Sequence, residues 1–85
     1  MIKEYIHKSV DRGRIRWQRH ALERMMERGI FRDDVKKVLT EGELIEKYPD
    51  DQPFPSGLFL GFPGADNQPL HVVAAFDSKT SGVTL

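Results

Sequence analysis

The sequence predicts a single α+β domain in which two to three N-terminal helices pack on one face of a small antiparallel β-sheet. Apolar residues follow the helical period of about 3.6 residues in the first half of the chain, and strand-like runs replace them from residue 43 onward. Helices first and strands afterwards is the segregated order of an α+β fold. A chain of 85 residues has room for one hydrophobic core, so residues 1–85 are expected to form one domain.

The first half contains three segments with helical periodicity: residues 2–10, residues 19–28, and a segment from Asp33 to Gly42. Residues 14–17 alternate polar and apolar and are expected to be extended. In the second helix, one apolar stripe is expected to be buried, formed by Leu22, Met25 and Met26. Gly29 followed by Ile30 predicts a Schellman stop. In the third helix the expected core face is Val35, Val38 and Leu39.

The second half contains four strand-like runs, at residues 43–48, 57–62, 70–76 and 83–85. A proline-rich loop at 49–55, a hairpin loop at 63–69 and a turn at 78–82 are expected to connect them. The last run is short, so the sheet is expected to end on an unpaired edge. Such an edge is able to pair with another chain, and a homodimer is therefore one expected assembly.

The net charge of zero conceals an asymmetry between the two halves. Residues 1–40 carry 11 Lys or Arg against 6 Asp or Glu, a net charge of +5, whereas residues 41–85 carry 2 against 7, a net charge of −5. The basic half suggests a polyanionic or acidic partner, although the two halves also attract each other. No cysteine and no long apolar segment is present, which predicts a soluble, cytoplasmic protein without disulfides or a membrane span.

The second helix carries a basic stripe formed by His20, Arg24 and Arg28. With about 100° per residue, this stripe lies nearly opposite the apolar stripe of the same helix. Four-residue spacings pair Glu23 with Glu27 and Arg24 with Arg28, so like charges adjoin and an anion-binding role is favoured. The alternative is purely structural, with Arg24 paired to Glu27 and Arg28 paired to the acidic half.

Two further residues are candidates for chemistry. His71 alternates away from Leu70 and Val72 in its strand, and Tyr48 stands at a strand end before a proline. Metal-independent RNA cleavage needs a base for the 2′-hydroxyl, a cation for the phosphate and an acid for the leaving 5′-oxygen. Histidine and arginine fit those roles. His7 is expected to be a solvated surface residue, and no spacing predicts a metal site or a cofactor.

An ordered set of motifs resembles a bacterial family known as domain of unknown function 4258. The motifs are RHALERMMERGI at 19–30, DV at 34–35, GELIE at 42–46, YPDD at 48–51, PFPS at 53–56, LFLG at 58–61 and PLHVV at 69–73. That family looks like a relative of the RelE, ParE and BrnT toxins, which place helices against an antiparallel sheet. RelE and BrnT relatives cut RNA, whereas ParE relatives act on DNA gyrase.

The resemblance implies a toxin of a bacterial toxin–antitoxin system that acts as a metal-independent endoribonuclease. His20 and His71 would be its acid and base. Arg24 and Arg28 would be catalytic cations that also bind phosphate, Arg19 would assist in phosphate binding, and Tyr48 would be an auxiliary RNA contact. The implied partners are RNA and a cognate antitoxin, for which the resemblance suggests a zinc-finger protein. The alternative is a non-enzymatic interaction module that binds an antitoxin or another partner without cleaving RNA.

This chain departs from the family pattern at two places. Phe31 stands where the family usually has a helix-capping Ser or Thr. The family also continues past the position of Val83 into a strand ending near a Tyr-x-Pro sequence, which this chain lacks. The resemblance therefore implies that the last strand of the family is missing here.

Overall fold

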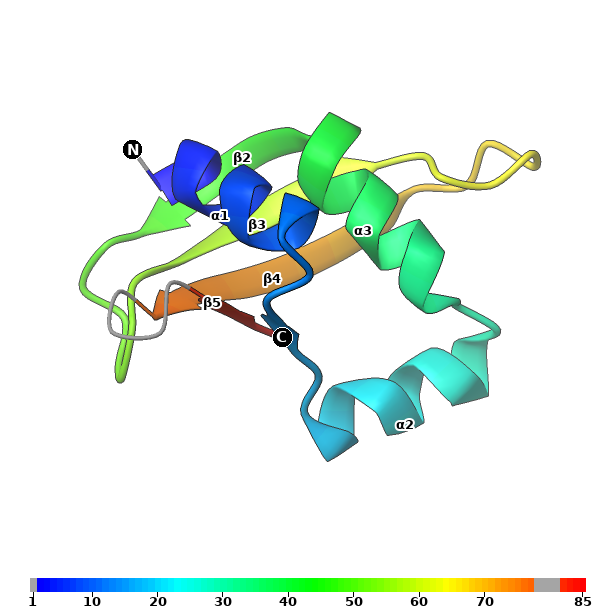
Figure 1. Ribbon diagram of the computed structural model, residues 1–85. Helices are drawn as coiled ribbons and strands as arrows, with labels where there is room; N and C mark the ends of the chain where they lie inside the picture. Colours follow the sequence, from blue (N-terminus) through cyan, green and yellow to red (C-terminus); the bar gives the residue numbers. More distant parts are fainter. Residues whose placement is uncertain (1, 78–81) are drawn as a thin grey trace.

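The computed structural model describes residues 2–77 and 82–85, which form three helices and five strands. Their order is α1 (Ile2–Asp11), β1 (Ile15–Arg16), α2 (Arg19–Arg28), α3 (Arg32–Glu41), β2 (Glu43–Tyr48), β3 (Ser56–Gly61), β4 (Leu70–Asp77) and β5 (Gly82–Thr84) (Figure 1). The predicted α+β class is confirmed. The bounds of α2 and β2 agree with the prediction, β3 begins one residue earlier, and the turn predicted at 78–82 lies largely outside the described residues.

The five strands form one sheet in the order β1-β5-β4-β3-β2. The pairs β2–β3, β3–β4 and β4–β5 are antiparallel, but β1 runs parallel to β5. The sheet is therefore mixed, and the expectation of a purely antiparallel sheet is wrong. The cause is the short extended segment before α2, where the carbonyl of Arg14 accepts a hydrogen bond of 2.9 Å from the Val83 amide.

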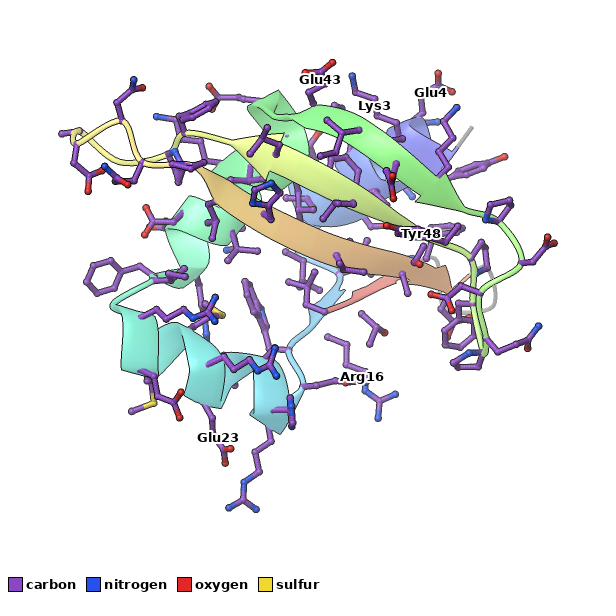
Figure 2. The ribbon with its side chains drawn as sticks, turned by 180° about the vertical axis from the view of Figure 1, so that it is seen from behind. Lys3, Glu4, Arg16, Glu23, Glu43 and Tyr48 are labelled. Atoms are coloured by element: carbon purple, nitrogen blue, oxygen red, sulfur yellow. The ribbon has the colours of Figure 1, made fainter. Side chains whose placement is uncertain are left out.

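Helices α1 and α3 cover one face of the sheet and enclose the core (Figure 1). The fully buried side chains at its centre are Ile6, Val38, Leu39, Phe59 and Val83. The expected core face of α3 is confirmed, since its buried residues are Val35, Val38 and Leu39. Figure 2 views the sheet from behind and shows the opposite face, which no helix crosses within the described part of the chain. This opposite face is called the open face below.

Helix α2 does not pack on the sheet, so the predicted buried stripe of Leu22, Met25 and Met26 is wrong. None of the residues of α2, all of which are described, is fully buried, and Met26 is 82% exposed. The physical reason is placement: α2 lies beside the sheet, beyond its β4 and β5 side, and no sheet face lies beneath its apolar residues (Figure 1). Met25 touches only the margin of the core.

The ends of α2 and α3 follow local sequence rules. Gly29 adopts a left-handed conformation with a φ of 66°, and the Ile30 amide donates to the Met25 carbonyl over 2.8 Å. This confirms the predicted Schellman stop. At the start of α3, the Phe31 side chain has no hydrogen-bonding atom, but the Phe31 amide donates to the Asp34 carboxylate over 3.0 Å. Half of a capping box therefore remains where a Ser or Thr cap is lacking.

His7 is half-buried rather than solvated, and its Nε2 atom has no hydrogen-bond partner among the described residues. The expectation for His7 is wrong because α1 packs against α3 as well as against the sheet.

Of the helices that the structure describes, none is long and apolar enough to cross a bilayer.

Candidate functional site

A cavity of about 340 Å³ separates α2 from β4, and we refer to it as the α2–β4 cavity. Its lining residues come from α2 and the residues on either side of it, from α3, from β4 and from the residue after β5: Gln18, His20, Ala21, Arg24, Met25, Arg28, Ile30, Val35, Leu70, His71, Val72, Val73 and Leu85. The four residues predicted to be catalytic, His20, Arg24, Arg28 and His71, therefore line one cavity. They come from segments more than forty residues apart in the sequence.

The orientation of α2 explains why its basic stripe faces this cavity. With residues about 100° apart, the five cavity-lining residues of α2 fall within an arc of about 140°. Leu22, Met26 and the two glutamates lie on the rest of the helix surface. Figure 2 shows Glu23 pointing away from the sheet. The helix therefore presents His20, Arg24 and Arg28 toward the cavity, whereas Arg19, Glu23 and Glu27 do not line it.

The α2–β4 cavity has two chemically different rims. Its apolar rim consists of Met25, Ile30, Val35 and Leu70, which pack with the core on the helix-covered side of the sheet. On β4, Val72 is buried on that same side, whereas His71 and Val73 are exposed on the open face. His20 and Arg24 occupy the part of the α2 arc farther from Met25. His20, Arg24, Arg28 and His71 form the basic rim.

The charge of the basic rim is not neutralised within the described part of the protein. No carboxylate lines the cavity, and neither Arg24 nor Arg28 has a hydrogen-bond or ion-pair partner among the described residues. The structural alternative expected Arg24 to pair with Glu27 and Arg28 to pair with the acidic half. Neither pair is present in the described part of the chain. Unpaired guanidinium groups beside imidazoles are suited to hold an anion.

Arg19 has a different environment from the other basic residues of α2. Its Nε atom lies 3.0 Å from a carboxylate oxygen of Glu23, four residues on, and both side chains are exposed. The comparison of four-residue spacings in the sequence missed this unlike pair. Arg19 does not line the α2–β4 cavity, so the structure does not bring it together with the predicted phosphate-binding arginines.

Tyr48 also lies apart from the basic rim. Its strand, β2, is separated from β4 by β3, which places the two strands roughly 10 Å apart. Along the sheet, Tyr48 is level with Ala75 rather than with His71. Its hydroxyl donates to the Glu46 carboxylate over 2.6 Å, and this bond is the main reason that the pKa of Tyr48 is raised. Tyr48 instead borders a separate hollow with Lys47, Pro49, Asp50, Asp51 and Val73.

A metal site was not predicted from the sequence. In residues 2–77 and 82–85, no group of three or more His, Asp or Glu side chains is placed to hold a metal ion. The apolar rim is the part of the cavity that the sequence analysis missed. The sequence patterns did mark Met25 and Val35 as apolar, but they assigned them to the core and not to the wall of a cavity.

Comparison with protein families shows that the family described as "Domain of unknown function (DUF4258)" matches residues 17–84. The chain belongs to the DUF4258 family. The DUF4258 region contains every residue that lines the α2–β4 cavity except Leu85. Helix α1 lies outside the DUF4258 match, although its Ile6 belongs to the core. The searches of curated proteins and of solved structures give no match.

Proposed function

We propose that the α2–β4 cavity is an RNA-cleaving site and that this DUF4258 domain is the endoribonuclease toxin of a toxin–antitoxin pair. The observation that carries the proposal is that one cavity brings together two histidines and two arginines, and that among the described residues these arginines have no partner and no carboxylate lines the cavity. The α+β class is shared with RelE-type toxins only as an analogy of fold, and fold alone does not assign chemistry. The side chains of the basic rim carry the argument.

These side chains suit phosphoryl transfer within the RNA strand. One imidazole of the His20 and His71 pair removes the proton of the 2′-hydroxyl, and the 2′-oxygen attacks the adjacent phosphorus. The bond from phosphorus to the 5′-oxygen breaks, and the second imidazole donates a proton to that oxygen. The products are a 2′,3′-cyclic phosphate and a free 5′-hydroxyl. Arg24 and Arg28 stabilise the negative charge on the non-bridging oxygens as the phosphorus becomes crowded.

The test is cleavage of a labelled RNA by the purified chain in the presence of a metal chelator. We expect products ending in a 2′,3′-cyclic phosphate, and no cleavage when the 2′-hydroxyl is absent from every nucleotide. His20→Gln and His71→Gln should each lower the cleavage rate by roughly a hundredfold or more, as is usual for loss of a proton-transfer group. Arg12→Ala, which removes an exposed arginine outside the cavity, should leave the rate unchanged.

Two results would contradict the proposal. The first is a folded wild-type protein that leaves all RNA substrates intact. The second is cleavage that persists in a folded His20→Gln, His71→Gln double variant. Circular dichroism of each variant shows whether its fold is retained.

A second candidate function is a protein-interaction module that does not cleave RNA. Large apolar side chains favour it: Met26 on α2 is 82% exposed and Phe31, just before α3, is 73% exposed. Expression of the wild-type protein and of the double histidine variant in a bacterial host separates the two functions. Growth arrest that requires both histidines supports the nuclease, and arrest that persists without them supports binding to a host protein.

A further inference from the structure

The open face of the sheet is apolar at its centre. Phe59 of β3 and Val72 of β4 lie side by side in the core, so the residues before and after each of them point toward the open face. Those residues are Leu58, Leu60, His71 and Val73. An antiparallel sheet that meets water on one face normally carries polar side chains there. Apolar residues on both faces are instead typical of strands that are covered on both sides.

Exposure shows how far these apolar side chains are open to solvent. Val73 is 54% exposed, and Leu58 and Leu60 are half-buried. All three lie on β3 and β4, and β3 lies on the side of the sheet away from β1 and β5. Figure 2 looks directly onto this face. We refer to Leu58, Leu60 and Val73 as the apolar centre.

Carboxylates border the apolar centre along β2. Glu43 lies beside Leu60 in the strand register, and Glu46 lies beside Leu58, so both glutamates point toward the open face. Glu46 accepts a hydrogen bond from the Tyr48 hydroxyl, whereas Glu43 has no hydrogen-bond or ion-pair partner among the described residues. The β2 margin of the open face is therefore negatively charged.

A hollow of about 580 Å³ extends the acidic margin beyond the end of β2. Asp50 and Asp51 line it together with Val73 of the apolar centre. The Asp51 carboxylate is held by the Ser56 hydroxyl, which donates to it over 2.7 Å. Asp50 has no hydrogen-bond or ion-pair partner in the part of the chain that the structure describes. Lys47 is the one cation among the residues that line this hollow.

We propose that the open face binds a basic amphipathic helix of a partner protein. The apolar stripe of that helix covers the apolar centre, and its lysines or arginines meet the carboxylates of Glu43 and Asp50. Carboxylates beside an apolar centre are complementary in charge to a helix that carries cations beside an apolar stripe. The helix supplies a third layer on the sheet. This surface is distinct from the α2–β4 cavity, and the proposal does not rest on RNA cleavage.

The dimensions and the charge of the face favour a basic helix over other occupants. Strands β2 and β4 are roughly 10 Å apart, which matches the width of one α-helix with its side chains, about 10–12 Å. Nucleic acid would bring phosphates against the carboxylates. The only basic residues of β2, β3 and β4 are Lys47 and His71. A second copy that presents the same strands would therefore add carboxylates without the cations to pair with them.

The test uses the isotopically labelled full chain and a capped, alanine-rich peptide of about 18 residues, long enough to form a helix by itself. Leucines at helical spacing give this peptide one apolar stripe, and lysines flank the stripe. We expect saturable shifts of the methyl signals of the apolar centre in NMR spectra, at roughly 1 mM peptide or below. Methyl signals of Leu39, buried on the other side of the sheet, should stay in place. A peptide with glutamate in place of lysine should bind at least about tenfold more weakly.

Val73→Thr tests the apolar centre within the protein. Threonine keeps the branched shape that suits a strand and replaces one methyl group by a hydroxyl. The lysine peptide should bind about threefold or more weakly to this variant, because less apolar area is buried. Val73→Ile keeps the apolar area and should retain the affinity. Since the Val73 side chain is more than half exposed, both variants should keep the spectrum of a folded protein.

Glu43→Gln together with Asp50→Asn tests the charges. Neither carboxylate has a partner among the described residues, so this double variant removes no contact of the fold there. The lysine peptide should bind roughly threefold to tenfold more weakly, as expected for the loss of two exposed ion pairs. Glu23→Gln together with Glu27→Gln removes the same charge from α2 and should leave the affinity unchanged.

Three outcomes would overturn the proposal. One is the absence of saturable change at the Leu58 and Val73 methyl signals with the lysine peptide. Another is equal affinity for the lysine and glutamate peptides. The third is a shift of the same methyl signals when the protein is concentrated without peptide, which would show that a second copy occupies the face.

Discussion

Tyr48 is one of the side chains whose surroundings in the fold change its acidity. Its hydroxyl donates to the Glu46 carboxylate, and this bond, followed by desolvation and by the negative charges of Glu46 and Asp51, raises its pKa above the ordinary value of 10.0. A raised pKa means that the fold favours the neutral phenol. The stability from this bond is therefore complete below pH 10 and is lost as the pH rises through the pKa of the folded protein.

Glu46→Gln should lower the pKa of Tyr48 toward 10, because the amide oxygen that replaces the carboxylate carries no charge. Phenolate absorbance during an alkaline titration measures this change, with Tyr5 as the second tyrosine to subtract. Glu43→Gln is the matched control, since Figure 2 places Glu43 and Tyr48 at opposite ends of β2. An unchanged pKa of Tyr48 in Glu46→Gln would show that the bond is not formed in solution.

Histidines on the basic rim illustrate what residue patterns predict without a structure. The alternation of β4 correctly placed His71 opposite to Val72, because side-chain direction in a strand depends only on position. The helical period likewise grouped His20 with Arg24 and Arg28. That these two groups share one cavity was not predictable from either pattern, since it depends on how α2 is placed beside β4. The sequence patterns could not separate Tyr48 from these residues for the same reason. The structure places it on β2, which β3 separates from β4.

At the scale of elements, the bounds of helices and strands were largely predictable and their packing was not. Gly29, Gly42 and Pro49 end elements through local backbone chemistry that can be read from the sequence. Burial depends on which neighbour an element meets. The apolar residues of α2 and α3 resemble each other in spacing, but only α3 lies over the sheet. The pairing of β1 with β5 joins opposite ends of the chain and likewise leaves no local signal.

Substitutions in α2 and α3 should therefore differ strongly in their effect on stability. Met26→Gln on α2 should change the free energy of unfolding by less than about 0.5 kcal/mol, because the side chain is mostly exposed. Leu39→Ala on α3 should cost about 2–5 kcal/mol, because the side chain is fully buried. Urea denaturation followed by circular dichroism measures both. Similar losses for the two variants would mean that α2 packs against the body of the protein in solution.

On the scale of the whole molecule, a net charge of zero does not describe the surface that a ligand meets. The basic rim collects His20, Arg24, Arg28 and His71, no carboxylate of the described residues lines the cavity, and Glu23 points away from the sheet. Basic side chains are therefore gathered at one place, although the chain as a whole is neutral. Three of these four residues come from the basic half of the sequence.

RNA binding to this surface should weaken as salt increases, with the logarithm of affinity falling linearly with the logarithm of salt concentration. For a single strand, each phosphate contact contributes about 0.7 to the slope, so Arg24→Ala with Arg28→Ala should reduce it by roughly 1.4. Fluorescence anisotropy of a non-cleavable RNA at several salt concentrations measures the slope. Arg12→Ala should leave it unchanged, and an unaltered slope in the double variant would place the RNA elsewhere.

The placement of α2 beside the core has a consequence for how such a protein can diverge. A helix that lines a cavity without filling the interior is under little pressure to keep particular residues for folding. Mutations on its inner arc alter the side chains that line the cavity, while Leu39 and Phe59 continue to hold α3 on the sheet. New specificity and retained foldability are therefore nearly independent traits in this architecture. Variation among descendants of this sequence should accumulate on α2 sooner than on α3.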